Sequence, residues 1–379
     1  MYRYIFENVK KDLKKKIVLI SGPRQAGKTT LSKMLFKDFE YLNYDYDEDR
    51  NRIEKKEWDR KKDLVIFDEI HKMNKWKAWL KGIYDIDGVR PQILVTGSAQ
   101  LDTLRKVGDS LAGRYFSYRL HPLDLKEIKK YYSEIKNDEA FLRLLNHGGF
   151  PEPFFDGTEN FYKRWRRTHN DIIIKQDLLS IEKVTNITGI ENLVRLMRTR
   201  VGSNISYTNL ARDLEVDPKT IKSWLDILER LFVIFKVVPY SKKIKNSLLK
   251  APKYYFYDNG QVQGDDGIKL ENLVACALLK ELHHIQDVTG DDVGLYYLRN
   301  KKGEEIDFFI TIDNKPIKLI EVKWSDDQLS KNFKAYDVYF SKISKLQLVG
   351  KIDREKTLSH DTEIRLASKW LSEIDLKKQ

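Results

Sequence analysis

Short apolar runs separated by polar residues divide the first third of the chain into segments typical of buried strands. Such runs cover residues 17–20, 64–67 and 93–95, and a segment of helical character follows the first of them, over residues 31–39. A further short strand is expected at residues 41–44. Strands that alternate with helices are typical of an α/β domain. We therefore expect the chain to begin with an α/β domain.

The middle of the chain has the apolar spacing of amphipathic helices. This pattern extends from residue 126 to residue 190 and is interrupted by His-Gly-Gly-Phe-Pro-Glu-Pro at residues 147–153. Glycine and proline clusters of this kind end helices. We expect this region to form a helical lid that follows the first domain in the sequence.

Residues 205–245 predict two short helices, a strand and a basic hairpin. Ser206 is expected to cap the first helix, and Pro218 suits the first position of the second. This order is typical of a winged helix, which either binds DNA or only packs against the neighbouring domain. In a DNA complex, the residues that face the major groove would be Lys219, Thr220, Lys222 and Ser223.

The last third of the chain contains strand-like segments near residues 254–258, 295–299, 303–310 and 319–324, and an apolar helix over residues 267–282. Mixed strands and helices again predict an α/β domain. The candidate chemistry of this region is described below, after that of the first domain.

The first apolar run leads into a loop with the pattern GxxxxGK[ST], which is typical of a phosphate-binding P-loop. Its glycines permit a tight turn that directs N–H groups at phosphate oxygens, and the next helix adds its positive N-terminal end. Lys28 can reach the β- and γ-phosphates, and the Thr29 hydroxyl can hold Mg²⁺. The predicted nucleotide site comprises Gly22, Pro23, Arg24, Gln25, Ala26, Gly27, Lys28, Thr29 and Thr30.

Acidic and hydroxyl residues follow the next two apolar runs. Asp68 and Glu69 end the run 64–67 as in a Walker B strand, where Asp68 would bind Mg²⁺ and Glu69 would act as the general base on the attacking water. In a P-loop sheet, the strand 92–97 lies beside Walker B, so a polar group at its tip can sense the γ-phosphate. Thr96 and Ser98 are both candidates for this sensor.

An arginine after a loop can stabilise charge on the transferred phosphoryl group, usually that of a neighbouring subunit. Arg114 is our candidate for this arginine finger, and Arg119 is the second choice. The hypothesis requires copies of the chain to assemble.

A third set of charged residues lies near the C-terminus. Asp307 heads a predicted hairpin, and Glu321-x-Lys323 lies on the adjacent strand, which is the signature of PD-(D/E)XK nucleases. Asp307 and Glu321 would hold one or two Mg²⁺ or Mn²⁺ ions, with Glu271 as a further ligand. Lys323 shares a strand face with Glu321 and would position the attacking water. The alternative is an inherited fold in which Lys323 forms a buried salt bridge with Asp307 or Glu321.

The motifs GPRQAGKTT, LVIFDEIHK, ILVTGSAQ, LAGRYFSYRLHPLDLKEI and HGGFPEP resemble those of AAA+-type ATPases of archaea and bacteria that carry a C-terminal domain of unknown function. The resemblance covers nearly the whole chain, and its last two motifs are the more specific ones. It implies that Lys28 and Thr29 bind nucleotide and Mg²⁺, that Asp68 and Glu69 form Walker B, and that Arg114 is the candidate finger. In that family the C-terminal part resembles PD-(D/E)XK nucleases.

Composition narrows the choice of partner and compartment. The net charge of +12 over 379 residues favours an anionic partner, with DNA as the first candidate, although a generally basic surface would give the same balance. A single cysteine, Cys276, excludes a disulfide within the chain and fits a reducing cytoplasm. No apolar run is long enough to span a bilayer, and we do not expect the first residues to form a signal peptide.

These observations predict a cytoplasmic, Mg²⁺-dependent ATPase that acts on or near DNA. Its expected partners are ATP, ADP, DNA and copies of itself. The rival hypothesis is a nucleotide-controlled switch or scaffold whose nuclease-like domain is catalytically silent. The predicted domains are an AAA+ P-loop core at 1–125, a helical lid at 126–190, a winged helix at 191–250 and a PD-(D/E)XK nuclease-like α/β domain at 251–379.

Overall fold

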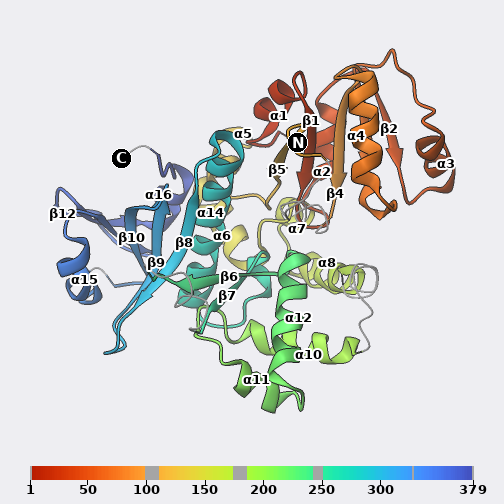
Figure 1. The fold of residues 1–379 in the computed structure, drawn as a ribbon. Coiled ribbons are helices and arrows are strands. Elements are labelled where there is room, and N and C mark those ends of the chain that lie inside the picture. Colours follow the sequence, from red (N-terminus) through yellow and green to blue (C-terminus); the bar gives the residue numbers. More distant parts are fainter. Residues whose placement is uncertain (1, 99–110, 174–185, 242–250, 327, 378–379) are drawn as a thin grey trace. The chain divides into compact units, whose positions relative to one another are not determined.

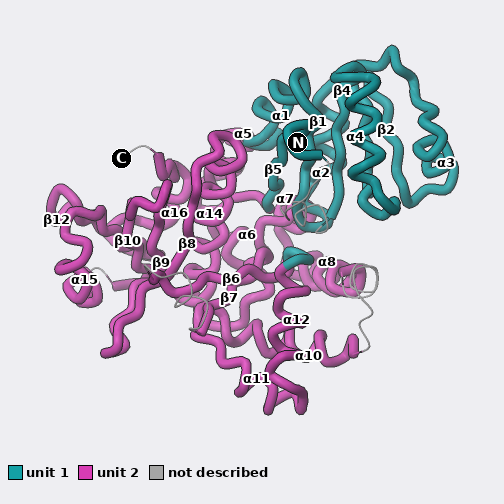
Figure 2. The backbone as a smooth tube through the Cα atoms, viewed as in Figure 1, with its two compact units in different colours: residues 1–121, 230–232 teal, residues 122–229, 233–379 magenta. Residues whose placement is uncertain are grey.

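The computed structural model describes residues 2–98, 111–173, 186–241, 251–326 and 328–377. The chain divides into two compact units, which Figure 2 shows in different colours. The first contains residues 1–121 and 230–232, and the second contains residues 122–229 and 233–379.

The first unit is built on a five-stranded sheet with the order β2-β3-β4-β1-β5, in which every pair of neighbours is parallel (Figure 1). The strands expected from the apolar runs are confirmed. The helix after the first strand begins earlier than expected, at Lys28. The elements are α1 (Phe6–Asp12), β1 (Ile17–Ser21), α2 (Lys28–Met34), β2 (Phe39–Asn43), α3 (Asp47–Lys55), β3 (Leu64–Asp68), the 3-10 helix η1 (Ile70–Lys72), α4 (Trp76–Asp87), β4 (Gln92–Gly97) and β5 (Tyr115–Arg119).

Two apolar cores, one on each face, explain why the central strands are apolar throughout. Alternate side chains of β1 and β3 point to opposite faces, so that Leu19 and Val65 join one core while Val18 and Ile66 join the other. Because the strands are parallel, the C-terminal ends of β1, β3 and β4 lie at one edge of the sheet. The loops that carry the predicted nucleotide-binding residues therefore meet there.

The second unit begins with a run of helices, as the spacing predicted. The side chain of Ser206 accepts a hydrogen bond from the backbone N–H of Asn209 and so caps α11, as expected. No helix among the described residues is both long enough and apolar enough to cross a membrane. The helices are α5 (Leu125–Tyr131), α6 (Asn137–His147), α7 (Pro151–Asp156), α8 (Glu159–Ile172), α10 (Ile187–Arg198), α11 (Tyr207–Asp213), α12 (Pro218–Arg230), η4 (Asn259–Gln261), α14 (Asp266–Thr289), α15 (Asn332–Phe340) and α16 (Ala367–Ser372).

The same unit contains an eight-stranded mixed sheet with the order β12-β13-β11-β10-β9-β8-β6-β7. Strands β8, β9 and β10 are antiparallel neighbours, whereas β10, β11 and β13 are parallel. The strands are β6 (Ile234–Pro239), β7 (Lys253–Phe256), β8 (Val293–Arg299), β9 (Glu305–Ile312), β10 (Lys315–Lys323), β11 (Ser344–Val349), β12 (Lys356–Ser359) and β13 (Thr362–Leu366).

Strand β6 has two roles in this sheet, because it pairs with β7 in an antiparallel hairpin and with β8 in parallel. The hairpin therefore belongs to the same sheet as the C-terminal strands. The boundary predicted between residues 250 and 251 falls in the connection between these two paired strands. The subdivision of the second unit into a lid, a winged helix and a nuclease-like domain stays a prediction. The basic residues Lys242, Lys243 and Lys245 lie outside the described residues.

Candidate functional site

The P-loop lies between β1 and α2 and requires glycine at both ends. Gly22 and Gly27 have φ values of 151° and 96°. A Cβ atom on Gly22 would lie 2.2 Å from the carbonyl oxygen of Leu120, so no larger residue fits there. The Lys28 ammonium donates hydrogen bonds of 2.8 Å to each of the backbone carbonyls of Gly22 and Pro23. Both of these acceptors are uncharged carbonyl groups of the loop.

Asp68 collects three hydroxyl donors at the C-terminal end of β3. Its carboxylate accepts hydrogen bonds from Thr29 at 3.1 Å, Tyr41 at 2.6 Å and Thr96 at 2.5 Å. The register explains the last contact, since Asp68 lies opposite Thr96 in the pairing of β3 with β4. A carboxylate beside a threonine hydroxyl is a ligand set that Mg²⁺ prefers, so these residues fit a nucleotide-bound magnesium ion.

Glu69 follows Asp68 in a left-handed conformation, with φ at 58°. Its N–H donates to the carbonyl of Thr96 at 2.9 Å, which fixes the start of the turn. One carboxylate oxygen, Oε2, is buried without a hydrogen-bond partner; His71 Nε2 and Lys72 Nζ lie 3.6 and 3.7 Å away. Burial, with a smaller contribution from Asp68, raises the pKa of Glu69. A buried carboxylate with a raised pKa and an unused oxygen is suited to accept a proton.

His71 beside this carboxylate is not a cation at neutral pH, because burial, followed by the charge of Lys72, lowers its pKa to about 4. Glu69 is therefore balanced mainly by lysine and arginine charges rather than by imidazolium. The Coulombic field of Lys72 lowers the pKa of Glu69, and so do those of Lys28 and Arg24, but burial outweighs them.

Two residues that support this site were not anticipated from the sequence. Arg3 is fully buried and donates to the carbonyl of Ala26 in the P-loop at 2.6 Å and to the carbonyl of His121. Tyr41 on β2 donates to Asp68. Neither residue belongs to a sequence motif. Each forms its hydrogen bond with a residue that is distant in the sequence.

The structure places Arg114, the first finger candidate, at the other end of the strands from the two sensor candidates, whereas Arg119 lies at the same end as they do. Thr96 is hydrogen-bonded to Asp68, and Ser98 is buried just beyond β4.

Arg114 precedes β5 at the opposite, N-terminal edge of the sheet, where its Nε lies 2.7 Å from the Asp85 carboxylate of α4. Arg119 lies opposite Ser21 near the P-loop edge and is buried. With roughly 3.3 Å per residue along a strand, Arg114 is too far away to reach a phosphate at its own P-loop. Its action across a subunit boundary stays a prediction.

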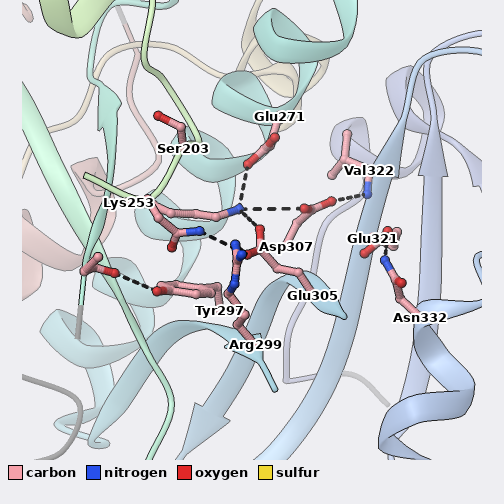
Figure 3. A network of polar contacts seen from close by, with 12 residues as sticks. Ser203, Lys253, Glu271, Tyr297, Arg299, Glu305, Asp307, Glu321, Val322 and Asn332 are labelled. Carbon is pink, nitrogen blue, oxygen red and sulfur yellow. Dashed lines mark hydrogen bonds and ion pairs between the residues drawn. The ribbon is translucent and has the colours of Figure 1, made fainter. Parts of the chain in front are cut away.

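The second unit brings together the charged residues predicted near the C-terminus (Figure 3). Pairing of Phe308 with Ile320 puts Asp307 on β9 and Glu321 on β10 at adjoining positions. The backbone N–H of Val322 donates to Asp307 at 2.8 Å. Glu271 of α14 faces the same cluster, as Figure 3 shows. Three carboxylates from one helix and two strands thus converge.

A lysine that the sequence did not point to lies among these carboxylates. The Nζ of Lys253, on β7, is 2.6 Å from Glu305, 3.5 Å from Glu271 and 3.9 Å from Asp307, and only 2% of its side chain is exposed (Figure 3). Burial alone would lower the pKa of Lys253, but the charges of Glu271, Asp307 and Glu305 outweigh burial and raise it. Lys253 therefore stays an ammonium ion.

Glu321 and Lys323 form an ion pair, with 2.9 Å between Lys323 Nζ and Glu321 Oε1. This is one of the two salt bridges named above as the alternative to a nuclease site. Ser330 and Asn332 also donate to Oε1, at 3.1 and 3.2 Å, whereas Oε2 is buried without a hydrogen-bond partner. Burial, with a contribution from Asp307, raises the pKa of Glu321 to about 7. The same two causes raise the pKa of Glu271 to about 7.

The predicted metal ligands fit an ammonium ion better than a divalent cation. Lys253 approaches Glu271 and Asp307, and Lys323 occupies an oxygen of Glu321. No group of three or more histidine, cysteine, aspartate or glutamate side chains is arranged to hold a metal in the part of the chain that the structure describes. A metal role for Glu271, Asp307 and Glu321 stays a prediction that this geometry does not favour.

The predicted DNA contacts lie on α12. Lys219, Lys222 and Ser223 are exposed and Thr220 is half-buried. The opposite face of α12 packs inward through the apolar residues Ile221, Trp224, Leu225, Ile227 and Leu228. This division leaves a polar face on α12, on which Lys219 and Lys222 are exposed.

Comparison with known families divides the chain into three matched regions. A family model described as an AAA domain matches residues 14–129. Two models of domains of unknown function, DUF8612 and DUF4143, match residues 138–264 and 266–365. The predicted resemblance is thus confirmed for the ATPase domain and for the presence of C-terminal domains of unknown function. None of the three descriptions mentions a nuclease or DNA.

Curated relatives extend over most of the chain, and each is named an uncharacterized protein. One from Mycobacterium tuberculosis is 24% identical over 329 residues, which are 84% of this chain and 73% of the relative. One from Methanocaldococcus jannaschii is 26% identical over 358 residues, covering 85% and 78%. One from Haemophilus influenzae is 25% identical over 328 residues, covering 76% and 80%.

Among solved structures, a signal transduction ATPase with numerous domains (STAND) and a tetratricopeptide repeat sensor, from Pyrococcus horikoshii, shares 11% sequence identity. The match covers 76% of this chain and 48% of that chain, with a TM-score of 0.22, which is too low to carry an argument about fold or function. The family matches carry the conclusion instead: the chain contains an AAA-family ATPase domain, followed by two regions similar to domains of unknown function.

Proposed function

We propose that this protein is a Mg²⁺-dependent ATPase in which Glu69 is the general base. The observation that carries the proposal is the position of Asp68, which is bonded to Thr29 of the P-loop helix and to Thr96 of the adjacent strand. The residue that would hold magnesium, the residue that would hold phosphate and the base thus lie at one edge of one sheet. The AAA match over residues 14–129 supports the same function.

Each residue has a defined task in this proposal. Lys28 would exchange its carbonyl acceptors for phosphate oxygens, which are stronger partners because they are charged. Thr29 and Asp68 would hold Mg²⁺, which neutralises charge on the phosphates when it is bound. Glu69 would accept a proton from the attacking water, and its raised pKa makes it a stronger base than an ordinary glutamate. Thr96, bonded to Asp68, is the sensor that the geometry favours over Ser98.

Replacement of Lys28 tests the proposal. Lys28→Ala should abolish tight ATP binding and reduce turnover to background, because Lys28 is the cation expected to reach the β- and γ-phosphates. The matched control is Lys37→Ala, which removes an exposed lysine from the segment that follows α2. Nucleotide affinity and phosphate release would be measured for both variants. Wild-type turnover in purified Lys28→Ala would refute the assignment.

We further propose that the ATPase acts on or near DNA through the exposed face of α12. Lys219 and Lys222 are exposed on that face, and the net charge of +12 favours a polyanion. The double variant Lys219→Gln/Lys222→Gln should weaken duplex DNA binding and lower its salt dependence, because fewer counterions are released. Unchanged binding and an unchanged salt slope would leave α12 as a packing element.

For the C-terminal region, the position of Lys253 favours the hypothesis of a catalytically silent nuclease-like domain over that of an active nuclease. Glu271, Glu305, Asp307 and Glu321 are balanced by Lys253, Lys323 and the Arg299 guanidinium, whose Nη1 lies 3.0 Å from Glu305. A cluster that is nearly neutralised by its own side chains attracts a divalent cation only weakly. The test is a cleavage assay in Mg²⁺ and Mn²⁺ on branched, single-stranded and duplex DNA. Cutting by the wild type that is lost in Asp307→Ala and Lys323→Ala would restore the active-nuclease hypothesis.

A further inference from the structure

A pocket between α8 and α10 gathers an excess of positive charge. It has a volume of about 360 Å³ and lies wholly within the second unit. Five of its lining side chains are cationic and two are acidic. The cations are Lys163, Arg166, Arg167, Arg195 and Arg198, and the acidic residues are Asp171 and Glu191.

Helical spacing explains why these side chains converge. On α8, Lys163, Arg166 and Arg167 lie three and four residues apart, which places them on one face of the helix. On α10, Glu191, Arg195 and Arg198 repeat the same spacing. Each helix therefore turns a mainly polar stripe toward the pocket. The buried Val194 also lines the pocket, whereas Trp165 of α8 packs in an apolar cluster.

Like charges in this pocket are only partly compensated by the protein. Lys163 pairs with Glu159 at 2.6 Å, and Arg166 stacks over the ring of Tyr162 at 5.5 Å. Within the described ranges, no carboxylate forms an ion pair with the guanidinium of Arg195 or Arg198. The Nε of Arg198 is buried without a hydrogen-bond partner. A buried donor of this kind is unfavourable unless a ligand satisfies it.

The surroundings of Arg198 disfavour its positive charge. Burial, followed by repulsion from Arg166, lowers the pKa of Arg198, and Arg195 adds to the repulsion. Asp258 provides an attractive field, but it already accepts hydrogen bonds from the Tyr162 hydroxyl and the Gly260 N–H. An anion in the pocket would relieve the repulsion and supply acceptors.

We infer that this pocket binds phosphate groups. Planar guanidinium groups match phosphate oxygens in pairs, which makes clustered arginines better suited to phosphate than to a lone carboxylate. The volume admits a diphosphate or a short length of nucleic-acid backbone, but not a folded element of another protein. This site does not depend on the proposed ATPase mechanism, since none of its residues belongs to the P-loop unit.

Matched variants of full-length protein test the inference. All of them carry Lys28→Ala, so that the P-loop does not contribute to phosphate binding. Arg167→Gln and Arg195→Gln each remove one exposed pocket cation, whereas Arg164→Gln removes an exposed arginine of α8 that does not line the pocket. All three should fold with unchanged melting temperatures, because the altered side chains are exposed.

Two probes distinguish the source of the phosphate: pyrophosphate followed by calorimetry, and a fluorescent single-stranded oligonucleotide followed by anisotropy. Arg167→Gln and Arg195→Gln should each weaken binding roughly tenfold, as expected for loss of a charge-assisted hydrogen bond, and Arg164→Gln should leave it unchanged. This pattern with pyrophosphate assigns a small phosphorylated ligand, and the pattern with the oligonucleotide alone assigns nucleic-acid backbone. Equal losses in all three variants, or saturable binding of neither probe, would overturn the inference.

Discussion

Two buried lysines, Lys28 and Lys253, show how differently the two units use the same side chain. Lys28 donates to two backbone carbonyls of the P-loop, whereas Lys253 contacts three carboxylates. Neutral acceptors can be exchanged for a phosphate with a gain in electrostatic energy, because the new acceptor is charged. The ammonium of Lys253, by contrast, is already paired with carboxylates, and their negative charge is already partly balanced by it. Lys28 can thus exchange its acceptors for a phosphate, whereas Lys253 is already paired with the carboxylates beside it.

The same contrast holds for the acidic residues of the two sites. Asp68 is surrounded by hydroxyl donors, which orient it without cancelling its charge. Asp307 has a backbone N–H and the Lys253 ammonium as neighbours. A carboxylate held by neutral donors keeps its attraction for a cation, whereas one beside a buried ammonium loses much of it. The difference lies in the neighbours rather than in the acidic residues themselves.

The largest expected effect separates chemistry from binding in the first unit. Glu69→Gln preserves the shape of the side chain but removes the proton acceptor, so ATP turnover should fall by about 10²–10⁴-fold while ATP affinity stays close to that of the wild type. Single-turnover hydrolysis and nucleotide titration would measure the two effects. Poor binding with a normal rate per occupied site would assign Glu69 another role.

The next effect concerns stability in the second unit. Lys253→Met leaves three half-buried carboxylates without their common cation and should lower the free energy of unfolding by about 3–5 kcal/mol. The control is Lys236→Met on the paired strand β6, where the lysine is ion-paired with Glu229 but partly exposed, so the loss should be at most about 1 kcal/mol. Urea unfolding compares the two.

Divalent cations sharpen the same comparison. If Lys253 replaces a metal ion, Mg²⁺ or Mn²⁺ should recover part of the stability of Lys253→Met and none of that of Lys236→Met. Equal losses in the two variants, with no response to metal in either, would show that Lys253 is not the counter-ion of the cluster.

A smaller effect depends on pH. The pKa of Glu321 is about 7 in the folded protein, against an ordinary value of 4.5, so between these two pH values the folded state binds more protons than the unfolded state. This contribution is fully present below the ordinary value and is lost as the pH rises toward 7. Glu321→Gln should therefore flatten the decline in unfolding free energy between pH 5 and pH 8 by about 1–3 kcal/mol. If the free energy of unfolding had the same pH dependence in the variant and the wild type, Glu321 would not be the group that titrates.

The smallest effect tests whether Arg114 serves a neighbouring copy. Mixing Arg114→Ala with Lys28→Ala should restore a fraction of wild-type turnover, because mixed interfaces combine an intact P-loop with an intact arginine. Asp85→Asn is the control: it removes the carboxylate partner of Arg114 without removing the arginine, and should change the melting temperature little. A chain that stays monomeric with ATP and shows no complementation would leave Arg114 as a surface residue.

Motifs predicted much of the first unit because their chemistry is local. The order of strand, glycine loop and helix is contained in residues 17–34, and the structure places β1 and α2 there. The paired tips of β3 and β4 follow from the same pattern, since parallel strands end at one edge. Arg3 and Tyr41 escaped prediction because each reaches its partner only after the sheet has formed.

The sequence by itself determined which residue types could act at each site: a lysine and threonine after a glycine loop, two acidic residues after a buried strand, and Asp307 with Glu321-x-Lys323 near the C-terminus. Only the tertiary structure decided how these groups are balanced. Lys253 lies on a strand whose sequence carries no nuclease motif, and it reaches the carboxylates because β7 and the C-terminal strands share a sheet. Charge acts through space over a few ångströms, so the preference of a carboxylate for a metal or for an ammonium depends on what folding places beside it.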